Sequence, residues 1–162
     1  TGDGVSLFSD DANVAALKFG SSLTEILRAH LARIGAGDYF ALLAYVEMSD
    51  PHERVLEEIR HAVRDAKKAA TCLGFGPRFL HSTGQAYKGG PNTGVFLQVT
   101  CEDREDIAVP GQKYTFGVVK AAQARGDFQV LADRKRRALR AHLRDVDHGL
   151  ETLRVAVMQA LK

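Results

Sequence analysis

Residues 39–46 have the sequence Tyr39-Phe40-Ala41-Leu42-Leu43-Ala44-Tyr45-Val46, and no charged side chain interrupts this apolar run. Apolar and polar positions do not alternate in it, which predicts a strand that is buried on both faces. Such strands are typical of parallel sheets that carry helices on both sides. The segment therefore indicates an α/β fold, and it is the starting point for interpreting the rest of the chain.

A helix and a second strand are expected directly after this run. Asp50 is predicted to cap the helix, Pro51 fits its first position, and Glu53 stands three residues after the cap. An apolar stripe extends the helix to about Lys68 and comprises Val55, Ile59, Ala62, Val63 and Ala66. The short strand Ala70–Leu73 then completes a βαβ unit, whose crossover should be right-handed.

Two helices are expected before the first strand. The first is Asp11–Phe19, which should stop at Gly20. Ser21 and Ser22 are good caps for the second. Its apolar stripe comprises Leu23, Ile26, Leu27, Leu31 and Ile34, and Gly35 and Gly37 should end it.

The C-terminal half continues the α/β pattern. Expected elements are the strand Gly94–Thr100, a helix over Tyr114–Arg125, a short helical segment near Phe128–Asp133, the strand Arg137–Leu143 and a last helix from Val146. We find no internal repeat and no linker. The chain is therefore predicted to be one α/β domain with about four parallel strands.

Residues 74–94 are predicted to form a long loop, because they contain six glycines and two prolines. Loops beyond strand ends are where open α/β sheets bind ligands, and glycines let backbone N–H groups approach an anion. A small anionic ligand and a structural glycine-rich turn are both consistent with this composition. The segment matches neither the phosphate-loop nor the dinucleotide-binding pattern.

Composition limits the classes of function. The chain has 162 residues, 45% of them hydrophobic and 26% charged, which excludes intrinsic disorder and a disulfide scaffold. The net charge of +2 and the low aromatic content of 7% argue against nucleic acid as a partner. No apolar run approaches the roughly 20 residues of a membrane span, and the acidic N-terminus does not have the layout of a signal peptide. We expect a cytoplasmic protein in which Cys72 and Cys101 are reduced, buried thiols.

Two segments resemble a known enzyme family. GPRFLHSTGQAYKGGPNTGVFLQ at residues 76–98 and YTFGVVKAAQARGDF at residues 114–128 resemble the C-terminal part of glucose-6-phosphate isomerase. The similarity is greatest to the form fused behind transaldolase in some bacterial bifunctional proteins, and it extends from about Tyr39 to the end of the chain. A first residue other than Met also fits a processed or excised C-terminal piece of a larger enzyme.

The resemblance implies a second sugar-isomerase (SIS) subdomain, a flavodoxin-like or Rossmann-like parallel sheet flanked by helices. It also implies interconversion of glucose 6-phosphate and fructose 6-phosphate through a cis-enediol(ate), with no metal and no cofactor. The expected partners are the sugar phosphate, a missing N-terminal SIS subdomain and a transaldolase domain, and a homo-oligomer is possible. A non-catalytic sugar-phosphate-binding module and a simple interaction domain remain as alternatives.

Site residues follow from the resemblance at matching positions. His81 and Lys88 are expected to be catalytic, with His81 as a ring-opening acid–base or, alternatively, as a hydrogen-bonding turn residue. Residues 149–154, GLETLR, fit the family's Gly-x-Glu-x-x-Lys pattern with Arg154 in place of lysine, so the role of Arg154 would be electrostatic. The expected substrate-binding residues are Arg78, Ser82, Thr83, Gln85, Gly89, Gly90 and Asn92. We find no counterpart of the family's general-base glutamate or phosphate loop, so the chain resembles half of an active site.

The remaining histidines and the basic cluster receive simpler interpretations. His30 is predicted to pack in the core or an interface, and His52 and His61 to lie on a charged helix face. His142 and His148 lack the companions of a zinc site. The basic cluster is predicted to be a solvated face, with phosphate steering or an interdomain contact as the alternatives, and comprises Arg134, Lys135, Arg136, Arg137, Arg140 and Arg144.

Overall fold

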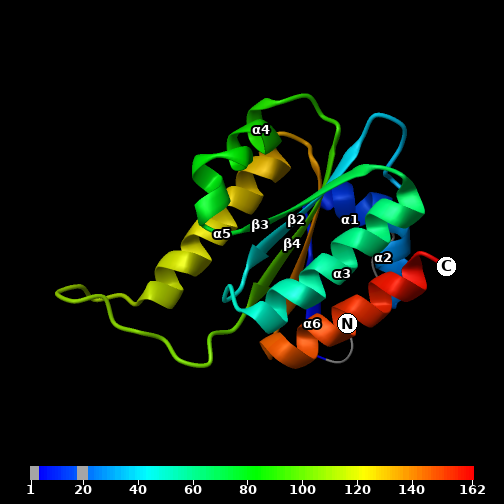
Figure 1. Cartoon of the computed structure of the whole chain (residues 1–162). Coiled ribbons are helices and arrows are strands. Elements are labelled where there is room, and N and C mark those ends of the chain that lie inside the picture. Colours follow the sequence, from blue (N-terminus) through cyan, green and yellow to red (C-terminus); the bar gives the residue numbers. More distant parts are fainter. Residues whose placement is uncertain (1–3, 18–21) are drawn as a thin grey trace.

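The structure of the protein is a computed structural model, and it describes residues 4–17 and 22–162. A five-stranded sheet with the order β1-β5-β4-β2-β3 forms its centre (Figure 1). The strands are β1 (Val5–Phe8), β2 (Tyr39–Tyr45), β3 (Ala70–Phe75), β4 (Gly94–Cys101) and β5 (Arg137–Leu143). Strands β2 to β5 are parallel, and β1 pairs antiparallel with β5. The predicted α/β class is confirmed.

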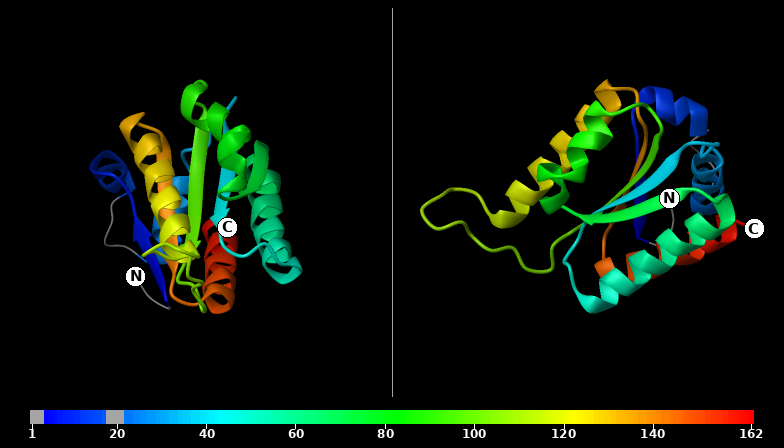
Figure 2. Two further views of the ribbon diagram at one scale, coloured as in Figure 1. Left: turned by 90° about the vertical axis from the view of Figure 1, so that its left-hand side faces the viewer. Right: turned by 45° about the horizontal axis from the view of Figure 1, so that its top comes forward.

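Helices cover both faces of the sheet (Figure 2). The helices are α1 (Asp11–Leu17), α2 (Leu23–Leu31), α3 (Asp50–Lys67), α4 (Thr83–Gly89), α5 (Phe116–Asp133) and α6 (Val146–Ala160). On one face α6 packs against both α2 and α3, and on the other α4 and α5 lie together. None of the helices in the described ranges is both long and apolar enough to cross a membrane.

Strand β2 is buried on both faces, as its sequence predicts. Phe40 and Leu42 belong to the larger apolar core under α2, α3 and α6, whereas Leu43 and Tyr45 belong to the smaller core under α4 and α5. Each of these four side chains has no measurable solvent exposure. The continuous apolar run is therefore required, because alternate residues fill two different cores.

Serine residues occupy the N-cap positions of α2 and α3. The Ser22 side chain accepts a hydrogen bond from the Glu25 amide, and the Glu25 carboxylate accepts one from the Ser22 amide, which forms a capping box. Ser49 rather than Asp50 is the N-cap of α3, and its side chain makes no capping bond. Helix α2 ends at Leu31, before Ile34, and the predicted positions Phe19, Gly20 and Ser21 lie outside the described residues.

The segment predicted as a loop is partly helical. Residues Arg78–His81 form a 3₁₀ turn and Thr83–Gly89 form α4, so the prediction of a continuous loop is wrong. Phe79 and Tyr87 explain the difference, because both are buried and their rings contact each other and the aromatic residues of β2 and β4. Burial of this apolar surface stabilises a helix that its glycine content disfavours.

Helix α5 is continuous from Phe116 to Asp133, so the predicted division into two segments is wrong. Gly126 is the reason for the error, because glycine in a helix interior is unfavourable by roughly 1 kcal/mol. The tertiary structure compensates for it through Asp127, Phe128 and Leu131, which are buried against the sheet.

Strand β1 was not predicted. It is four residues long, and its register places Leu7 opposite Ala141 and Phe8 opposite Arg140. Only pairing with β5 defines it as a strand, and short isolated runs of this kind carry little sequence signal.

Strand β3 is added on one side of β2, and β4 and β5 are added on its other side. From β2 the chain crosses through α3 to β3, then returns past β2 to β4, so β2 and β4 are neighbours whose following helices lie on opposite faces. A crevice opens at the carboxyl ends of two such strands, and ligands of open α/β sheets bind there. This edge, together with the sheet face under α5, is where a site is expected.

The fold predicts a specific loss of stability in acid, because His30 is fully buried as the neutral imidazole. Its Nε2 lies 3.0 Å from the Phe96 carbonyl oxygen, and burial lowers the pKa of His30 to about 3. The unfolded chain has a histidine pKa near ~6.5, so this contribution is fully present above about pH 6.5 and is lost as the pH falls toward 3. The free energy of unfolding should fall by up to about 1.4 kcal/mol per pH unit in this window.

Urea unfolding at several pH values measures this dependence, with His30→Gln as the matched variant. Glutamine can still donate to the Phe96 carbonyl, but it does not titrate. Between the pKa values of His30 in the folded and unfolded states, the free energy of unfolding of the variant should therefore depend less steeply on pH. The same slope in both proteins would contradict a buried neutral His30.

Candidate functional site

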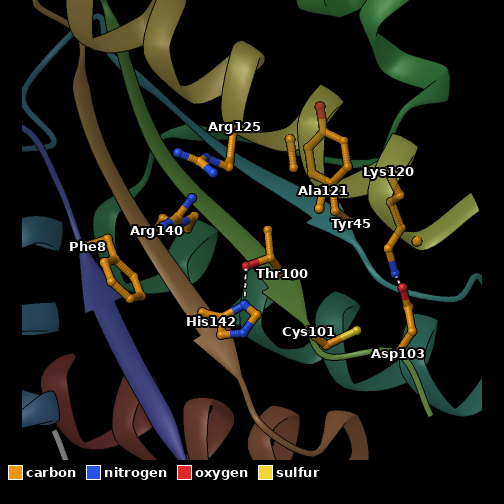
Figure 3. A pocket seen from close by; sticks show the side chains of 12 residues that line it. Phe8, Tyr45, Thr100, Cys101, Asp103, Lys120, Ala121, Arg125, Arg140 and His142 are labelled. Atoms are coloured by element: carbon orange, nitrogen blue, oxygen red, sulfur yellow. Dashed lines mark hydrogen bonds and ion pairs between the residues drawn. The ribbon is translucent and has the colours of Figure 1, made fainter. Parts of the chain in front are cut away.

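A pocket of about 270 Å³ lies between α5 and the sheet, near the carboxyl ends of β4 and β5 (Figure 3). Its α5 side includes Lys120, Ala121, Ala124 and Arg125. Its sheet side is formed by residues from four strands, namely Phe8, Tyr45, Thr100, Cys101, Arg140 and His142. The volume lies just below the roughly 300–1,000 Å³ typical of ligand sites, which favours a small metabolite over a dinucleotide.

Strand β5 supplies two basic side chains to this pocket through its alternation. Leu139, Ala141 and Leu143 belong to the core under α6, whereas Arg140 and His142 lie on the opposite face and line the pocket. Successive side chains of a strand point to opposite faces, so this alternation delivers both groups to the α5 side.

Two guanidinium groups lie near each other in the pocket. Figure 3 shows Arg125 from α5 and Arg140 from β5 side by side. Burial, followed by repulsion from Arg125, lowers the pKa of Arg140. The Arg140 guanidinium lies over the Phe8 ring, 4.5 Å from its centroid, and its buried Nε has no hydrogen-bond partner in the described structure.

His142 adds a neutral polar group to the same wall. Its Nδ1 lies 2.9 Å from the Thr100 hydroxyl oxygen. Burial and the neighbouring Arg140 lower the pKa of His142, so the imidazole is neutral at physiological pH. The Thr100 hydroxyl can therefore donate to Nδ1, which leaves the Nε2–H as a donor.

A third cation in the pocket is already neutralised. Lys120 forms an ion pair with Asp103, and Figure 3 shows this pair at the carboxyl-end margin of the pocket. At the inner end, the Tyr45 hydroxyl is buried, and burial together with the neighbouring Asp127 carboxylate raises the pKa of Tyr45. Among the residues that the structure describes, the pocket thus combines two arginines without ion pairs and the unpartnered Nε of Arg140.

The predicted substrate-binding residues are not brought together. Arg78, Ser82 and Thr83 line a shallow groove of about 360 Å³ after β3, which also contains Glu53 and Glu57. The Arg78 Nη1 lies 3.3 Å from the sulfur of Met48. The two glutamates make this groove less favourable for an anion than its arginine suggests.

Lys88 to Asn92 lie at the other end of α4, near the amino end of β4. The α4 helix spans seven residues, or about 10 Å at 1.5 Å per residue, and separates these residues from the groove of Arg78. The Arg136 Nη2 donates to the carbonyls of Lys88 and Gly90 at 2.7 and 2.6 Å, and the Asn92 side chain donates to the Lys135 carbonyl at 3.3 Å. No neighbouring atom lies within 4 Å of the position that a Cβ would take on Gly89.

Lys88 has a structural partner that the sequence did not indicate. Its Nζ lies 2.7 Å from Oδ1 of Asp127, whose side chain is only 2% exposed. Burial raises the pKa of the Asp127 carboxyl, and the Lys88 ammonium opposes this effect. The pair links α4 to α5 under the helical layer.

His81 and Gln85 are exposed around the start of α4. The Gln85 amide donates to the Leu80 carbonyl at 3.0 Å and so stabilises the turn. His81 lies just after β3, near the carboxyl edge of the sheet, where it is accessible to a ligand.

Arg154 lies on the other face of the sheet, on α6. It forms ion pairs with Glu151 and Glu58, and the structure does not bring it near His81 or Lys88. Packing explains the glycine at position 149 of the same motif, because a Cβ there would lie 2.8 Å from the Cβ of Leu143.

His52, predicted on a charged helix face, is buried against an acidic partner. Its Nε2 lies 2.8 Å from the Asp147 carboxylate and its Nδ1 lies 3.0 Å from the Glu47 carbonyl oxygen. These groups line a crevice of about 710 Å³ at the carboxyl ends of β2 and β4. Its walls carry five acidic residues against Arg104 and His52, namely Glu47, Glu102, Asp103, Glu105 and Asp147, so the crevice is poorly suited to an anion.

Three residues of the basic cluster also do not lie on a solvated face. Arg136 is only 6% exposed, Arg137 binds both carboxylate oxygens of Asp38 at 2.6 and 2.8 Å, and Arg140 lines the pocket. Cys72 and Cys101 are free thiols and half-buried. Within the described ranges, no group of three or more His, Cys, Asp or Glu residues is placed to hold a metal ion.

The basic pocket was missed because its residues are scattered through the sequence. Arg125 and Arg140 come from a helix and a strand whose contact only the fold establishes. The available signal was the alternation of Arg140 and His142 with apolar residues in β5, which indicates a polar inner face.

Comparisons with known proteins support the fold. No family profile and no curated protein sequence matches the chain. Among solved structures it is similar to a hypothetical protein from Thermus thermophilus, with a TM-score of 0.65 at 16% sequence identity. The match covers 94% of this chain and 44% of that protein, so the chain spans less than half of its neighbour's length. Both proteins share an α/β architecture of the Rossmann or flavodoxin kind.

Removing the partner of Asp127 should destabilise the protein. Lys88→Met should lower the free energy of unfolding by about 3 kcal/mol, because it leaves a buried carboxylate without its cation. Urea unfolding near neutral pH measures the loss. Lys113→Met, at an exposed loop lysine, is the matched control and should change stability by less than about 0.5 kcal/mol.

The double variant Lys88→Met/Asp127→Asn separates the ion pair from simple packing. It should recover part of the lost stability, because the buried group is then neutral. Equal stability of Lys88→Met and the control would show that the ion pair does not contribute.

Proposed function

We propose that the chain is the C-terminal SIS-type subdomain of a glucose-6-phosphate isomerase, which interconverts glucose 6-phosphate and fructose 6-phosphate. The observation that carries this proposal is the pair of segments at residues 76–98 and 114–128, which resemble that enzyme over the turn, the strand and the following helix. The version fused to transaldolase is the one most similar to these segments.

The architecture supports this assignment in a general way. The expected subdomain is a parallel sheet flanked by helices, and the chain has four parallel strands with helices on both faces. Because many unrelated activities use such folds, the function rests on the segments and their residues rather than on the architecture.

The reaction requires a group that opens the sugar ring, a carboxylate that moves a proton between C2 and C1, and cations near the developing enediolate oxygen. His81 fits the first role, because it is exposed near the carboxyl edge of the sheet and an imidazole can both donate and accept a proton. Asp103 and Asp127 are each held by a lysine. The sequence has no counterpart of the family's general-base glutamate, so we place the proton-transferring base in the remainder of the full-length protein.

The ion pairs reassign two of the expected catalytic residues. Lys88, bound to Asp127, contributes to the site by fixing α4 rather than by exchanging protons with substrate. Arg154, bound to two glutamates on the α6 face, would act only across an interface with another part of the enzyme.

A contact with the rest of the enzyme has a suitable surface. A long loop after β4 extends away from the sheet (Figure 1), and apolar side chains are exposed on it and on the start of α5. These are Ile107, Tyr114, Phe116 and Val118, with exposed fractions of 45–67%. Exposed apolar groups of this kind mark interaction sites, which supports the missing SIS subdomain as a partner.

A non-catalytic sugar-phosphate-binding module is the second candidate. It is favoured by the pocket under α5, which offers arginines for a phosphate but no carboxylate free of an ion pair among its described residues. Deuterium uptake at C1 of fructose 6-phosphate in D₂O, catalysed by the full-length protein, separates the two candidates. The isomerase should catalyse this exchange, and a binding module should not.

An amide-resolved NMR titration of this chain with fructose 6-phosphate tests the proposal directly. We expect shifts at residues 78–83, where the carboxyl end of β3 meets α4, and smaller ones at residues 88–92, which α4 holds about 10 Å away. His81→Gln should weaken the response at residues 78–83. Fructose at the same concentration is the control for the sugar alone.

The absence of any shift at residues 78–83 at millimolar fructose 6-phosphate would contradict a substrate site at this edge. Equal shifts with fructose would contradict recognition of a phosphorylated substrate there.

A further inference from the structure

We propose that the pocket between α5 and the β4–β5 face binds a small phosphate-bearing anion, with the phosphate held between Arg125 and Arg140. This inference rests on the geometry of the pocket and does not require the proposed isomerase function. It assigns a ligand class to residues that the sequence analysis did not place in a site.

The first argument is charge. Arg125 and Arg140 lie side by side, and among the described residues neither forms an ion pair with a carboxylate. The pocket's own acidic side chain, Asp103, is already paired with Lys120. Arg140 is half-buried and repulsion from Arg125 lowers its pKa, and a dianion between the two guanidinium groups would remove this repulsion.

The second argument is hydrogen bonding. The buried Nε of Arg140 has no protein partner in the described structure. Thr100 and His142 bond to each other, which leaves the His142 Nε2–H as a donor. Buried polar groups are normally satisfied, so unused donors around a cavity indicate a ligand or ordered water. A phosphate has enough acceptor oxygens for both of these donors at once.

The third argument is the shape of the remaining surface. Phe8, Ala121 and Ala124 form apolar parts of the wall, which suit the carbon skeleton of a small phosphate ester. Stacking on Phe8 explains the position of the Arg140 guanidinium, because its carbon lies 4.5 Å from the ring centroid. Arg125 is held by no comparable contact with an aromatic ring in the described ranges, so its position beside Arg140 is not explained by packing.

Binding should be linked to the protonation of His142. The groups that face this imidazole are Arg140 on its own strand, Thr100 and Glu102 on and after β4, Lys120 on α5, and Ser6, its register partner on β1. Burial and the two cations Arg140 and Lys120 lower the pKa of His142, and Glu102 opposes them. A bound dianion should raise the pKa of His142 toward its ordinary value.

The experiment is a titration of this chain with inorganic phosphate at constant ionic strength, followed by amide NMR and by the imidazole signals of His142. We expect localised shifts at Thr100, Lys120, Arg125, Arg140 and His142, together with a rise in the pKa of His142. Arg125→Gln should weaken phosphate binding by about tenfold or more, because it removes a charged donor. Arg125 is exposed, so this variant should fold normally.

Arg64→Gln on α3 is the matched control, because Arg64 is an exposed arginine on the opposite helical layer and is bound to Asp65. It should leave phosphate binding unchanged. Equal affinity in Arg125→Gln and Arg64→Gln would overturn the proposal, and so would an unchanged pKa of His142 at saturating phosphate. Shifts spread over the surface without a maximum at the pocket would also overturn it.

Fructose 6-phosphate and fructose complete the test and separate this inference from the proposed function. The phosphate ester should shift the pocket residues and fructose should not. Shifts in the pocket without any at residues 78–83 would support this anion site and contradict the proposed substrate site. Shifts at residues 78–83 alone would overturn the anion site and support the proposed function.

Discussion

The burial of β2 on both of its faces is the constraint on which the rest of the structure depends. Each alternate side chain of this strand fills one of two cores, so helices must cover both sides of the sheet. The chain meets this requirement by sending α3 to one face and α4 and α5 to the other. The same division leaves β2 and β4 side by side, with connections that diverge at their carboxyl ends. Both the acidic crevice and the basic pocket lie near that edge.

The two cores differ in polarity, and this difference is what makes a site possible. Under α2, α3 and α6 the sheet presents almost only aliphatic side chains. Under α4 and α5 the sheet presents Gln98, Arg140 and His142, and the Lys88–Asp127 pair joins the two helices above it. Buried polar groups cost free energy unless they are paired, so each must serve either the fold or a ligand. Lys88 is paired with Asp127 and the Gln98 Nε2 donates to the Ala124 carbonyl, whereas the buried Nε of Arg140 has no partner in the described structure.

Local sequence signals predicted most elements because each carried a strong pattern of its own. The apolar run of β2, the capping serine of α2 and the stripe of α6 were all sufficient. The failures have a common physical cause. Helix α4, the continuous α5 and strand β1 depend on contacts that are distant in sequence, namely the aromatic packing of Phe79 and Tyr87, the burial of Phe128 and Leu131, and pairing with β5. Glycine content suggested breaks at places where this burial outweighs helix propensity.

The sequence by itself determined the α/β class, four of the five strands, and a resemblance that points to sugar-phosphate chemistry. These follow from periodicity and short motifs, which are properties of neighbouring residues. Only the tertiary structure decided which polar groups meet. It divided the expected site between the two ends of α4, paired Lys88 with Asp127, buried His52 against Asp147, and brought Arg125 to Arg140. The physical reason is that charge pairing acts through space, and the distances between these side chains are set by the packing of helices on the sheet.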